Sequence, residues 1–479
     1  MNRLVLVSAV VVVALVVSSL AYVALGPGGA GKSSTLSGTA SSATSSGTGG
    51  SATGSGTTLA QNGQGCSPAD WTTYHGNNSR SGHAPSPTSS AGADWVSPHL
   101  DGEVYAEPLS CGGRLMVATE NDTVYSLNAT SGAVEWRTHL GAPMQGSSLP
   151  CGDIDPSGIT GTPVIDPASG LVYVVAFLTP GAHKLVGLNV ADGTVRFSRS
   201  ADPPGANPLV EQQRGALTLA GGRVYVPYGG LLGDCGDYHG WVVGLDADGT
   251  GGLISYQVQS QREAGIWAPS GAATDSSGDI FVATGNGASE SQFDYGNSVI
   301  ELSPALKQLG YFAPTNWQQL NQGDTDLGSF GPLLLADGEI LQVGKEGTGY
   351  LLNASDLGGI GGQLYSSNVC GSAFGGGAES EGMAFVPCTD GLFAVATSPK
   401  SFQVAWHSPR FPAGPPIVTG GTVWTLDTSS GTLHGYDAST GAELHSFDAG
   451  QVTRFTTPSF GDGRIFVAAG TQVLAFLVG

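Results

Sequence analysis

Short apolar stretches, each introduced by a glycine, recur along the chain from residue 113 onward. Each stretch alternates large apolar residues with small or polar ones, which is the pattern of a β-strand. Eight such strands are predicted, beginning at Gly113, Gly170, Gly222, Gly278, Gly338, Gly382, Gly421 and Gly463. A second strand follows each of them, and sustained helical periodicity is scarce. The pattern therefore predicts an all-β protein.

The repeating unit is predicted to contain four strands. In segments such as YSLNATSGAVEW the second strand runs into an Asx-type turn and then into a third strand that carries an aromatic residue. A short strand of small residues, as in TGTPVID, precedes each glycine-led strand. Four antiparallel strands in about 40 residues are typical of a propeller blade. The expected fold is an eight-bladed β-propeller of four-stranded antiparallel blades.

The last unit has no outer strand of its own, because the chain ends with VLAFLVG. Near the start, ADWVSPHLDG resembles WRTHLG, the outer strand of the first blade. We therefore expect residues 95–100 to complete the eighth blade and to close the ring. Closure would remove the unpaired edges of the first and last blades.

The early units carry insertions. The interval between matched positions is 61 residues from Leu127 to Leu188 but only 40 from Tyr436 to Phe476. Loops added to a repeating frame tend to gather on one face and to build the site there. The stretch 278–303, GDIFVATGNGASESQFDYGNSVIELS, has a long polar insert that begins at Asn286 and is expected to be exposed.

The N-terminal segments precede the predicted propeller. Residues 1–25 contain Arg3 and then an apolar run that is long enough to cross a bilayer, although Ser19-Leu20-Ala21 also suits a cleavage site. Residues 26–65 are rich in Gly, Ser and Thr, which predicts a disordered linker. Residues 66–479 are expected to form the propeller. We expect an extracytoplasmic propeller tethered to the cell membrane, or a secreted one if the first segment is cleaved.

Charge and cysteine content limit the cellular compartment and the classes of partner that are expected for this chain. The chain has 38 acidic and 17 basic residues, which gives a net charge of −21 and argues against nucleic acid as a partner. Six cysteines in an exported chain predict disulfides. We expect Cys370 to pair with Cys388, since they flank one predicted strand. The further pairs proposed are Cys151 with Cys235 and Cys66 with Cys111, among 15 arrangements.

The repeats resemble a known family. The turn motifs LNATSGAVEW and YDASTGAEL are similar to those of the eight-bladed propellers of pyrroloquinoline-quinone (PQQ) dehydrogenases and their PQQ-like repeat relatives. The resemblance covers nearly all of residues 68–479 and implies the fold. It leaves the function open, because non-catalytic scaffolds such as the propeller lipoprotein of outer-membrane β-barrel assembly share these repeats.

A sharper resemblance to the dehydrogenases lies within residues 234–345. It implies PQQ with Ca²⁺ or a lanthanide as cofactors, and it assigns roles to individual residues. The implied roles are a quinone floor for Trp267, a metal ligand for Asn286 of the TGN motif, the catalytic base for Asp324, a further metal ligand for Asp326 and a quinone contact for Lys345. Asp234 is the acid nearest to the sequence position of the family's metal-binding glutamate, so the resemblance implies a metal ligand there too.

The chain also departs from the dehydrogenases. It has no adjacent cysteine pair and lacks the tryptophan-rich surroundings of the base. Each residue has a structural interpretation as well: Trp267 as packing between blades, Asn286 as a turn residue, Asp324 and Asp326 as solvated carboxylates and Lys345 as their counter-charge.

Two hypotheses about function follow. One is a quinoprotein that oxidises an alcohol or sugar and passes electrons to an acceptor. The other is a non-catalytic platform for a protein, peptide or cell-wall ligand.

Overall fold

The computed structural model describes residues 65–84 and 91–478. The predicted membrane segment, residues 1–25, and nearly all of the predicted linker, residues 26–65, lie outside the described residues. Among the described residues, no helix is both long and apolar enough to cross a bilayer.

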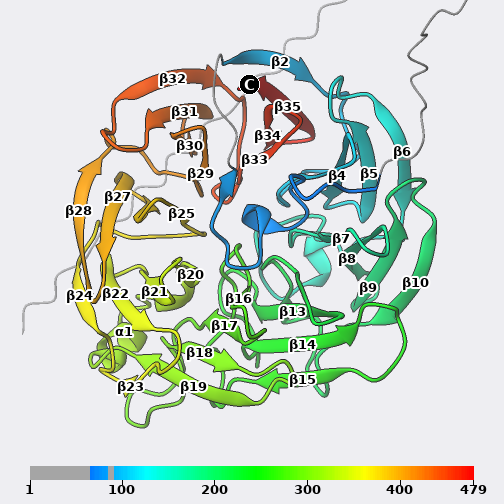
Figure 1. The fold of residues 1–479 in the computed structure, drawn as a ribbon. Helices are drawn as coiled ribbons and strands as arrows, with labels where there is room; N and C mark the ends of the chain where they lie inside the picture. Colours follow the sequence, from blue (N-terminus) through cyan, green and yellow to red (C-terminus); the bar gives the residue numbers. More distant parts are fainter. Residues whose placement is uncertain (1–64, 85–90, 479) are drawn as a thin grey trace, which may run out of the picture. The chain divides into compact units, whose positions relative to one another are not determined.

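Eight sheets form a ring of blades, each with four antiparallel strands (Figure 1), which confirms the predicted propeller; three of the sheets carry a short fifth strand, β1 (His83–Ala84), β11 (Glu211–Gln212) or β23 (Gly359–Ile360). Blades 1 to 4 consist of β3 (Leu109–Cys111), β4 (Arg114–Thr119), β5 (Thr123–Asn128) and β6 (Val134–His139); β7 (Val164–Asp166), β8 (Leu171–Leu178), β9 (Ala182–Asn189) and β10 (Val195–Ser200); β12 (Thr218–Ala220), β13 (Arg223–Gly230), β14 (Trp241–Asp246) and β15 (Ile254–Gln257); and β16 (Ala273–Thr274), β17 (Ile280–Ala283), β18 (Val299–Leu302) and β19 (Gln308–Ala313).

Blades 5 to 8 follow the same plan. They consist of β20 (Leu333–Leu334), β21 (Glu339–Gln342), β22 (Thr348–Asn353) and β24 (Tyr365–Asn368); β25 (Ala378–Ser380), β26 (Met383–Cys388), β27 (Gly391–Ser398) and β28 (Ser401–His407); β29 (Ile417–Thr419), β30 (Thr422–Asp427), β31 (Thr432–Asp437) and β32 (Glu443–Asp448); and β33 (Ser459–Gly461), β34 (Arg464–Ala469), β35 (Gln472–Leu477) and β2 (Gly92–Val96). The remaining elements are β1 (His83–Ala84), β11 (Glu211–Gln212), β23 (Gly359–Ile360), the helix α1 (Trp317–Gln322) and the 3₁₀ turns Tyr74–Gly76, Gly146–Ser148 and Leu327–Ser329.

The turn before each second strand requires a backbone conformation that explains the glycine at this position. All eight of these glycines have positive φ, from 68° at Gly170 to 85° at Gly338. The turn from the innermost strand into the second strand needs this left-handed conformation, which glycine adopts without a steric penalty. The second strands that follow are buried on both faces, as the pattern of β4 shows. Neighbouring blades cover them.

The ring is closed by an N-terminal strand, as predicted. β2 pairs antiparallel with β35, and the two lie side by side in Figure 1. The pairing continues beyond the strand, since the Leu100 N–H donates to the Thr471 carbonyl at 2.8 Å. The strand itself begins at Gly92, so the contact starts slightly earlier than the expected residues 95–100.

A second N-terminal feature, residues 71–84, was not predicted. We call it the axial segment, because it crosses the centre of the ring (blue in Figure 1). It hydrogen-bonds to the innermost strands of several blades. Its carbonyl groups accept hydrogen bonds from the backbone N–H groups of Ser110, Ile165, Thr274, Glu379 and Val418. Its last residues form β1, which pairs parallel with β29. These backbone hydrogen bonds alone link the segment to five blades at the axis.

Arg80 holds the axial segment in place from within. Its side chain is 1% exposed. The guanidinium donates to the carbonyls of Leu217 and Ala272, to the Thr218 hydroxyl at 2.6 Å, and to the segment's own Thr73 and Tyr74. Burying a guanidinium is costly unless its donors are satisfied. Here every guanidinium nitrogen has a partner.

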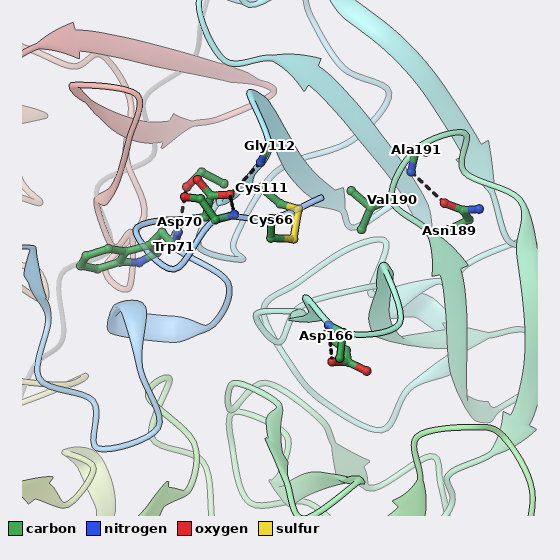
Figure 2. The surroundings of a disulfide bond; sticks show 12 residues. Cys66, Asp70, Trp71, Cys111, Gly112, Asp166, Asn189, Val190 and Ala191 are labelled. Atoms are coloured by element: carbon green, nitrogen blue, oxygen red, sulfur yellow. Dashed lines mark hydrogen bonds between the residues drawn. A yellow bond between two sulfur atoms is a disulfide. The ribbon is translucent and has the colours of Figure 1, made fainter. Parts of the chain in front are cut away.

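The start of the axial segment is fixed by a disulfide (Figure 2). Cys66 pairs with Cys111 at the end of β3, and Asp70 beside it accepts the backbone N–H of Gly112 at 2.8 Å. The Trp71 N–H donates to the Ser110 hydroxyl at 2.9 Å. The pairs Cys151–Cys235 and Cys370–Cys388 are also present, so all three predicted disulfides are confirmed.

Two buried carboxylates join blade 1 to blade 2. Glu120 accepts the Gly158 N–H at 2.7 Å, and Asp122 accepts the Phe177 N–H at 3.3 Å. Glu120 and Asp122 are 1% and 0% exposed, and each has one buried oxygen without a partner among the described residues. Burial raises the pKa of Glu120 to about 7 and that of Asp122 to about 8.

Replacing Arg80 with Met should lower the free energy of unfolding by about 3–5 kcal/mol, because several carbonyl and hydroxyl groups lose a charged donor. Urea denaturation measures the change. Arg196→Met, at an exposed position on β10, is the control and should leave stability within about 0.5 kcal/mol of the wild type. Equal stability of Arg80→Met and the control would contradict this role for Arg80.

Stability should also fall as the pH rises through about 7 to 8. Both carboxyls have a folded-state pKa above the unfolded value, so their favourable contribution is complete below the unfolded pKa and is lost as they ionise in the fold. The double variant Glu120→Gln with Asp122→Asn should lose less stability between mildly acidic and mildly alkaline pH, as followed by urea denaturation. The exposed Glu290→Gln is the control. A double variant that follows the wild-type curve would refute this origin of the pH dependence.

Candidate active site

The strand directions place two kinds of loop at one end of the blades. In an antiparallel blade, the loop that leads into the innermost strand and the loop between the second and third strands lie at the same end. We call this end the loop face. The insertions fall in these loops, including residues 201–217, 258–272 and 284–298.

A cavity of about 260 Å³ lies on the loop face. Five of the six residues singled out from the sequence line it: Asp234, Trp267, Asp324, Asp326 and Lys345. They come from blades 3, 4 and 5. The lining also includes Arg214, Arg454 and Phe455, which the sequence had not indicated.

Trp267 forms one wall of the cavity and is 7% exposed. Its ring packs on three glycines. A Cβ at Gly285, Gly265 or Gly229 would lie 2.2, 2.3 or 3.0 Å from a ring carbon, so a side chain at the first two would displace the indole. Gly285 belongs to the TGN motif, which explains why a small residue stands there. The contacts fix the plane of the tryptophan.

Lys345 joins the two acids of the GDTD motif. Its ammonium lies 2.5 Å from the carboxylate of Asp326 and 3.2 Å from that of Asp324. Burial acts to lower the pKa of Lys345, but the two carboxylates outweigh it and hold that pKa above its usual value. Asp326 is buried, whereas the Asp324 side chain is 67% exposed. Asp324 is therefore the acid that is open to a ligand.

Asn286 does not line the cavity but lies directly behind Asp326. Its backbone N–H donates to the Asp326 carboxylate at 2.8 Å, and its amide nitrogen lies 3.4 Å from the carboxylate of Glu263. The Asn286 side-chain oxygen is buried and accepts no hydrogen bond from the described residues. Glu263 also pairs with Arg262.

The polar insert after Asn286 supports Asp326 from the other side. The Asn297 side chain accepts the Leu327 N–H at 2.7 Å and donates to Asn321 of α1 at 2.8 Å. Of the insert, residues 286–295, only Ala288, Glu290, Ser291 and Gln292 are exposed, whereas Gly287 and Asp294 are buried, which corrects the prediction of an exposed insert. Asp294 is tolerated inside because its carboxylate accepts the backbone N–H groups of Ser289 and Gly296.

Several non-glycine residues at the site have left-handed backbone conformations. Asp234 has a φ of 53°, Glu263 of 72°, Ala264 of 55° and Asp324 of 48°. Each costs about 1–2 kcal/mol and persists only where neighbouring contacts impose it. For Asp234, one such contact is the hydroxyl of Tyr238, which donates to its carboxylate at 2.6 Å. Burial and this hydrogen bond raise the pKa of Tyr238 above its usual value.

Behind the cavity wall lie oxygen atoms of the kind that hold a hard cation, although both carboxylates already pair with a cation of the protein, Asp326 with Lys345 and Glu263 with Arg262. The unpartnered Asn286 oxygen and the carboxylates of Asp326 and Glu263 are the oxygen ligands that Ca²⁺ and similar ions prefer. Glu263 is the carboxylate that Asn286 contacts through its side-chain amide. Nothing in the sequence indicated Glu263, because its approach depends on the left-handed backbone of residues 263–264. Two clusters in the described residues combine cysteines with an aspartate, but their cysteines are in disulfides.

The fold and the cavity define an eight-bladed propeller of the PQQ-like class with a candidate site on its loop face. The family model described as outer membrane protein assembly factor BamB matches residues 55–355 and 393–477. This is most of the chain, and the protein therefore belongs to this PQQ-like repeat family. No curated protein sequence matches the chain.

Solved structures of both enzymes and scaffolds resemble the propeller. The quinohemoprotein alcohol dehydrogenase of Comamonas testosteroni has a TM-score of 0.67 at 16% identity, with 86% of this chain and 81% of that chain covered. A europium-containing methanol dehydrogenase gives 0.66 at 14%, with 86% and 98% covered. BamB from Moraxella catarrhalis gives 0.56 at 13%, with 81% and 98% covered. At these identities the likeness establishes the fold alone.

Gly285→Ala should destabilise the protein by about 1–3 kcal/mol, the usual cost of overpacking. The added methyl group would displace Trp267. Combining it with Trp267→Leu should remove most of this cost, because the smaller side chain leaves room for the methyl group. Urea denaturation of the single and double variants measures the coupling. Gly252→Ala is the control, since a Cβ there meets nothing within 4 Å. Additive effects of the two substitutions would contradict the contact.

Proposed function

We propose that the protein is a membrane-tethered, extracytoplasmic quinoprotein that binds PQQ, or a closely similar quinone, in the cavity of the loop face and oxidises an alcohol or a sugar. One observation carries the proposal: a flat indole wall, held by glycines, faces a cavity that also contains Arg214, Lys345 and Arg454. A planar quinone with several carboxylates suits an aromatic wall flanked by cations.

The residues of the cavity then take distinct roles. Trp267 stacks on the flat ring and fixes its plane. Lys345 orients the ring oxygens and favours negative charge on them, since its own pKa is raised. Asp324, the most exposed acid of the group, is the base that accepts the hydroxyl proton of the substrate. A bound quinone supplies the two-electron oxidant that turns the alcohol into a carbonyl compound, and a separate acceptor must reoxidise it.

Asn286, Asp326 and Glu263 would hold a Ca²⁺ or lanthanide ion. The buried, unpartnered oxygen of Asn286 supports this assignment. Asp234 has a structural role in this proposal, since Tyr238 occupies one of its oxygens at 2.6 Å.

A non-catalytic platform is the second candidate. The name of the matching family model, an outer-membrane assembly factor, favours it. The contact of Lys345 with both Asp324 and Asp326 favours it too, because the two acids already have a counter-charge within the protein. Under this alternative the loop face binds a protein, a peptide or a cell-wall ligand.

Titration with PQQ in the presence of Ca²⁺ or a lanthanide tests the proposal. Calorimetry should show saturable binding that Lys345→Met and Asn286→Ala weaken roughly tenfold or more, as expected for the loss of a charged or metal-held contact. Lys307→Met, at an exposed turn, is the control. Asp324→Asn should keep PQQ binding and lose turnover of an alcohol with an artificial electron acceptor. A flat titration of the folded wild type would rule out the quinoprotein and leave the platform.

A further inference from the structure

Arg214 is a cation in the cavity without a counter-ion among the described residues. Its Nε donates to the Trp267 carbonyl at 3.1 Å. The two terminal nitrogens have no protein partner, although a guanidinium offers several more donors. The side chain is half-buried and lies over the rings of Trp267 and Phe455, at 5.6 and 5.8 Å from their centres. Its unused donors are therefore available to a ligand.

The other charged groups of the cavity already have partners. Lys345 pairs with Asp324 and Asp326. Arg454 pairs with Asp153 at 2.8 Å at the rim, and Asp234 accepts the Tyr238 hydroxyl. No carboxylate lies within ion-pair distance of Arg214 in the described part of the chain.

Arg454 strengthens the need for an anion at Arg214. Its guanidinium lies 5.0 Å from the centre of the Phe455 ring, so two cations flank one aromatic side chain. Burial and this neighbouring charge lower the pKa of Arg214 to about 10, although the carboxylates of Asp153 and Asp326 act more weakly in the opposite direction, so it remains protonated at neutral pH. Two like charges in a partly desolvated site repel each other, and an anion between them removes the repulsion.

A small recess beside the cavity provides the space. It has a volume of about 20 Å³, lies over Tyr74 of the axial segment, and shares Arg214, Arg454 and Phe455 with the main cavity. This is room for about one water-sized group, so the rest of a larger ligand would lie in the main cavity. Tyr105 also lines the recess, and its hydroxyl has no hydrogen-bond partner in the described residues. Glu103, Glu120 and Asp153 are the carboxylates near Tyr105.

We infer that this recess is an anion-binding subsite, in which Arg214, with Arg454 and Tyr105, receives a single carboxylate or phosphate group of a small ligand. Of the three nearby acids, Glu103 is exposed to solvent, Asp153 is already paired with Arg454, and Glu120 has a pKa of about 7 and hydrogen bonds of its own. The charge of Arg214 is thus the one left for the ligand. The subsite does not require a quinone: it would serve equally for an anionic substrate or for the anionic end of a platform ligand.

Titration without quinone or metal tests the subsite. Inorganic phosphate and lactate are the probes, glycerol is the neutral control, and calorimetry at low ionic strength is the measurement. Phosphate or lactate should bind saturably and glycerol should not. Arg214→Gln should weaken binding roughly tenfold or more, as expected for a charge-assisted hydrogen bond. Arg196→Gln, exposed on β10, should bind like the wild type.

Arg214→Lys controls for a folding defect in Arg214→Gln, because lysine keeps the positive charge but lacks the forked donors of the guanidinium. It should bind more tightly than Arg214→Gln and more weakly than the wild type. Failure of both anions to bind the wild type would overturn the inference, as would equal binding by the wild type and Arg214→Gln.

A second arm identifies the source of the anionic group and keeps this inference separate from the quinone proposal. If Arg214→Gln weakens PQQ binding as well as phosphate binding, the subsite receives a carboxylate of the cofactor. If it weakens phosphate and lactate binding but not PQQ binding, the subsite belongs to a separate anionic ligand. Both results support the subsite. A flat PQQ titration together with phosphate binding would remove the quinone proposal alone.

Discussion

The burial of one guanidinium at the axis is the constraint on which the rest of the propeller depends. Arg80 would destabilise the interior if any of its donors lacked a partner. The partners are backbone and hydroxyl oxygens of blades 3 and 4 and of the axial segment itself. Satisfying them fixes where the segment crosses the ring. The segment in turn places Tyr74 in the lining of the recess, so this part of the recess wall depends on the burial of Arg80.

The fold was largely predictable because its signals are local. A second strand that is buried on both faces gives a short apolar run, and the left-handed turn before it requires glycine. Each blade can therefore be recognised from about ten consecutive residues. The axial segment gave no such signal. Arg80 stands in the polar stretch NNSRSGH and resembles a surface residue, because its burial depends on carbonyls more than a hundred residues away.

The candidate site was predictable in part. Trp267, Asp324, Asp326 and Lys345 were found because the motifs that contain them are sequence patterns, and the antiparallel blade then brings their loops to one face. The position of Asn286 behind Asp326 could not be predicted, since it follows from a backbone hydrogen bond. Glu263 was missed because its approach depends on the left-handed backbone of residues 263–264, and Arg214 because its contact with Trp267 joins residues that are distant in the sequence. Only the scarcity of basic residues in so acidic a chain could have drawn attention to Arg214.

The hydrogen bonds of the axial segment also bear on biogenesis. The segment is translated before every strand that binds it, and its partners extend from Ser110 in blade 1 to Thr457, whose hydroxyl meets that of Tyr74 just ahead of blade 8. Its binding site is therefore complete only when almost the whole polypeptide has been synthesised. A prematurely terminated chain contains the axial segment with Arg80. It lacks some of the later residues that form hydrogen bonds with the segment in the complete fold. Such a fragment exposes unpaired polar groups of the axial segment, whereas in the intact molecule these groups are hydrogen-bonded.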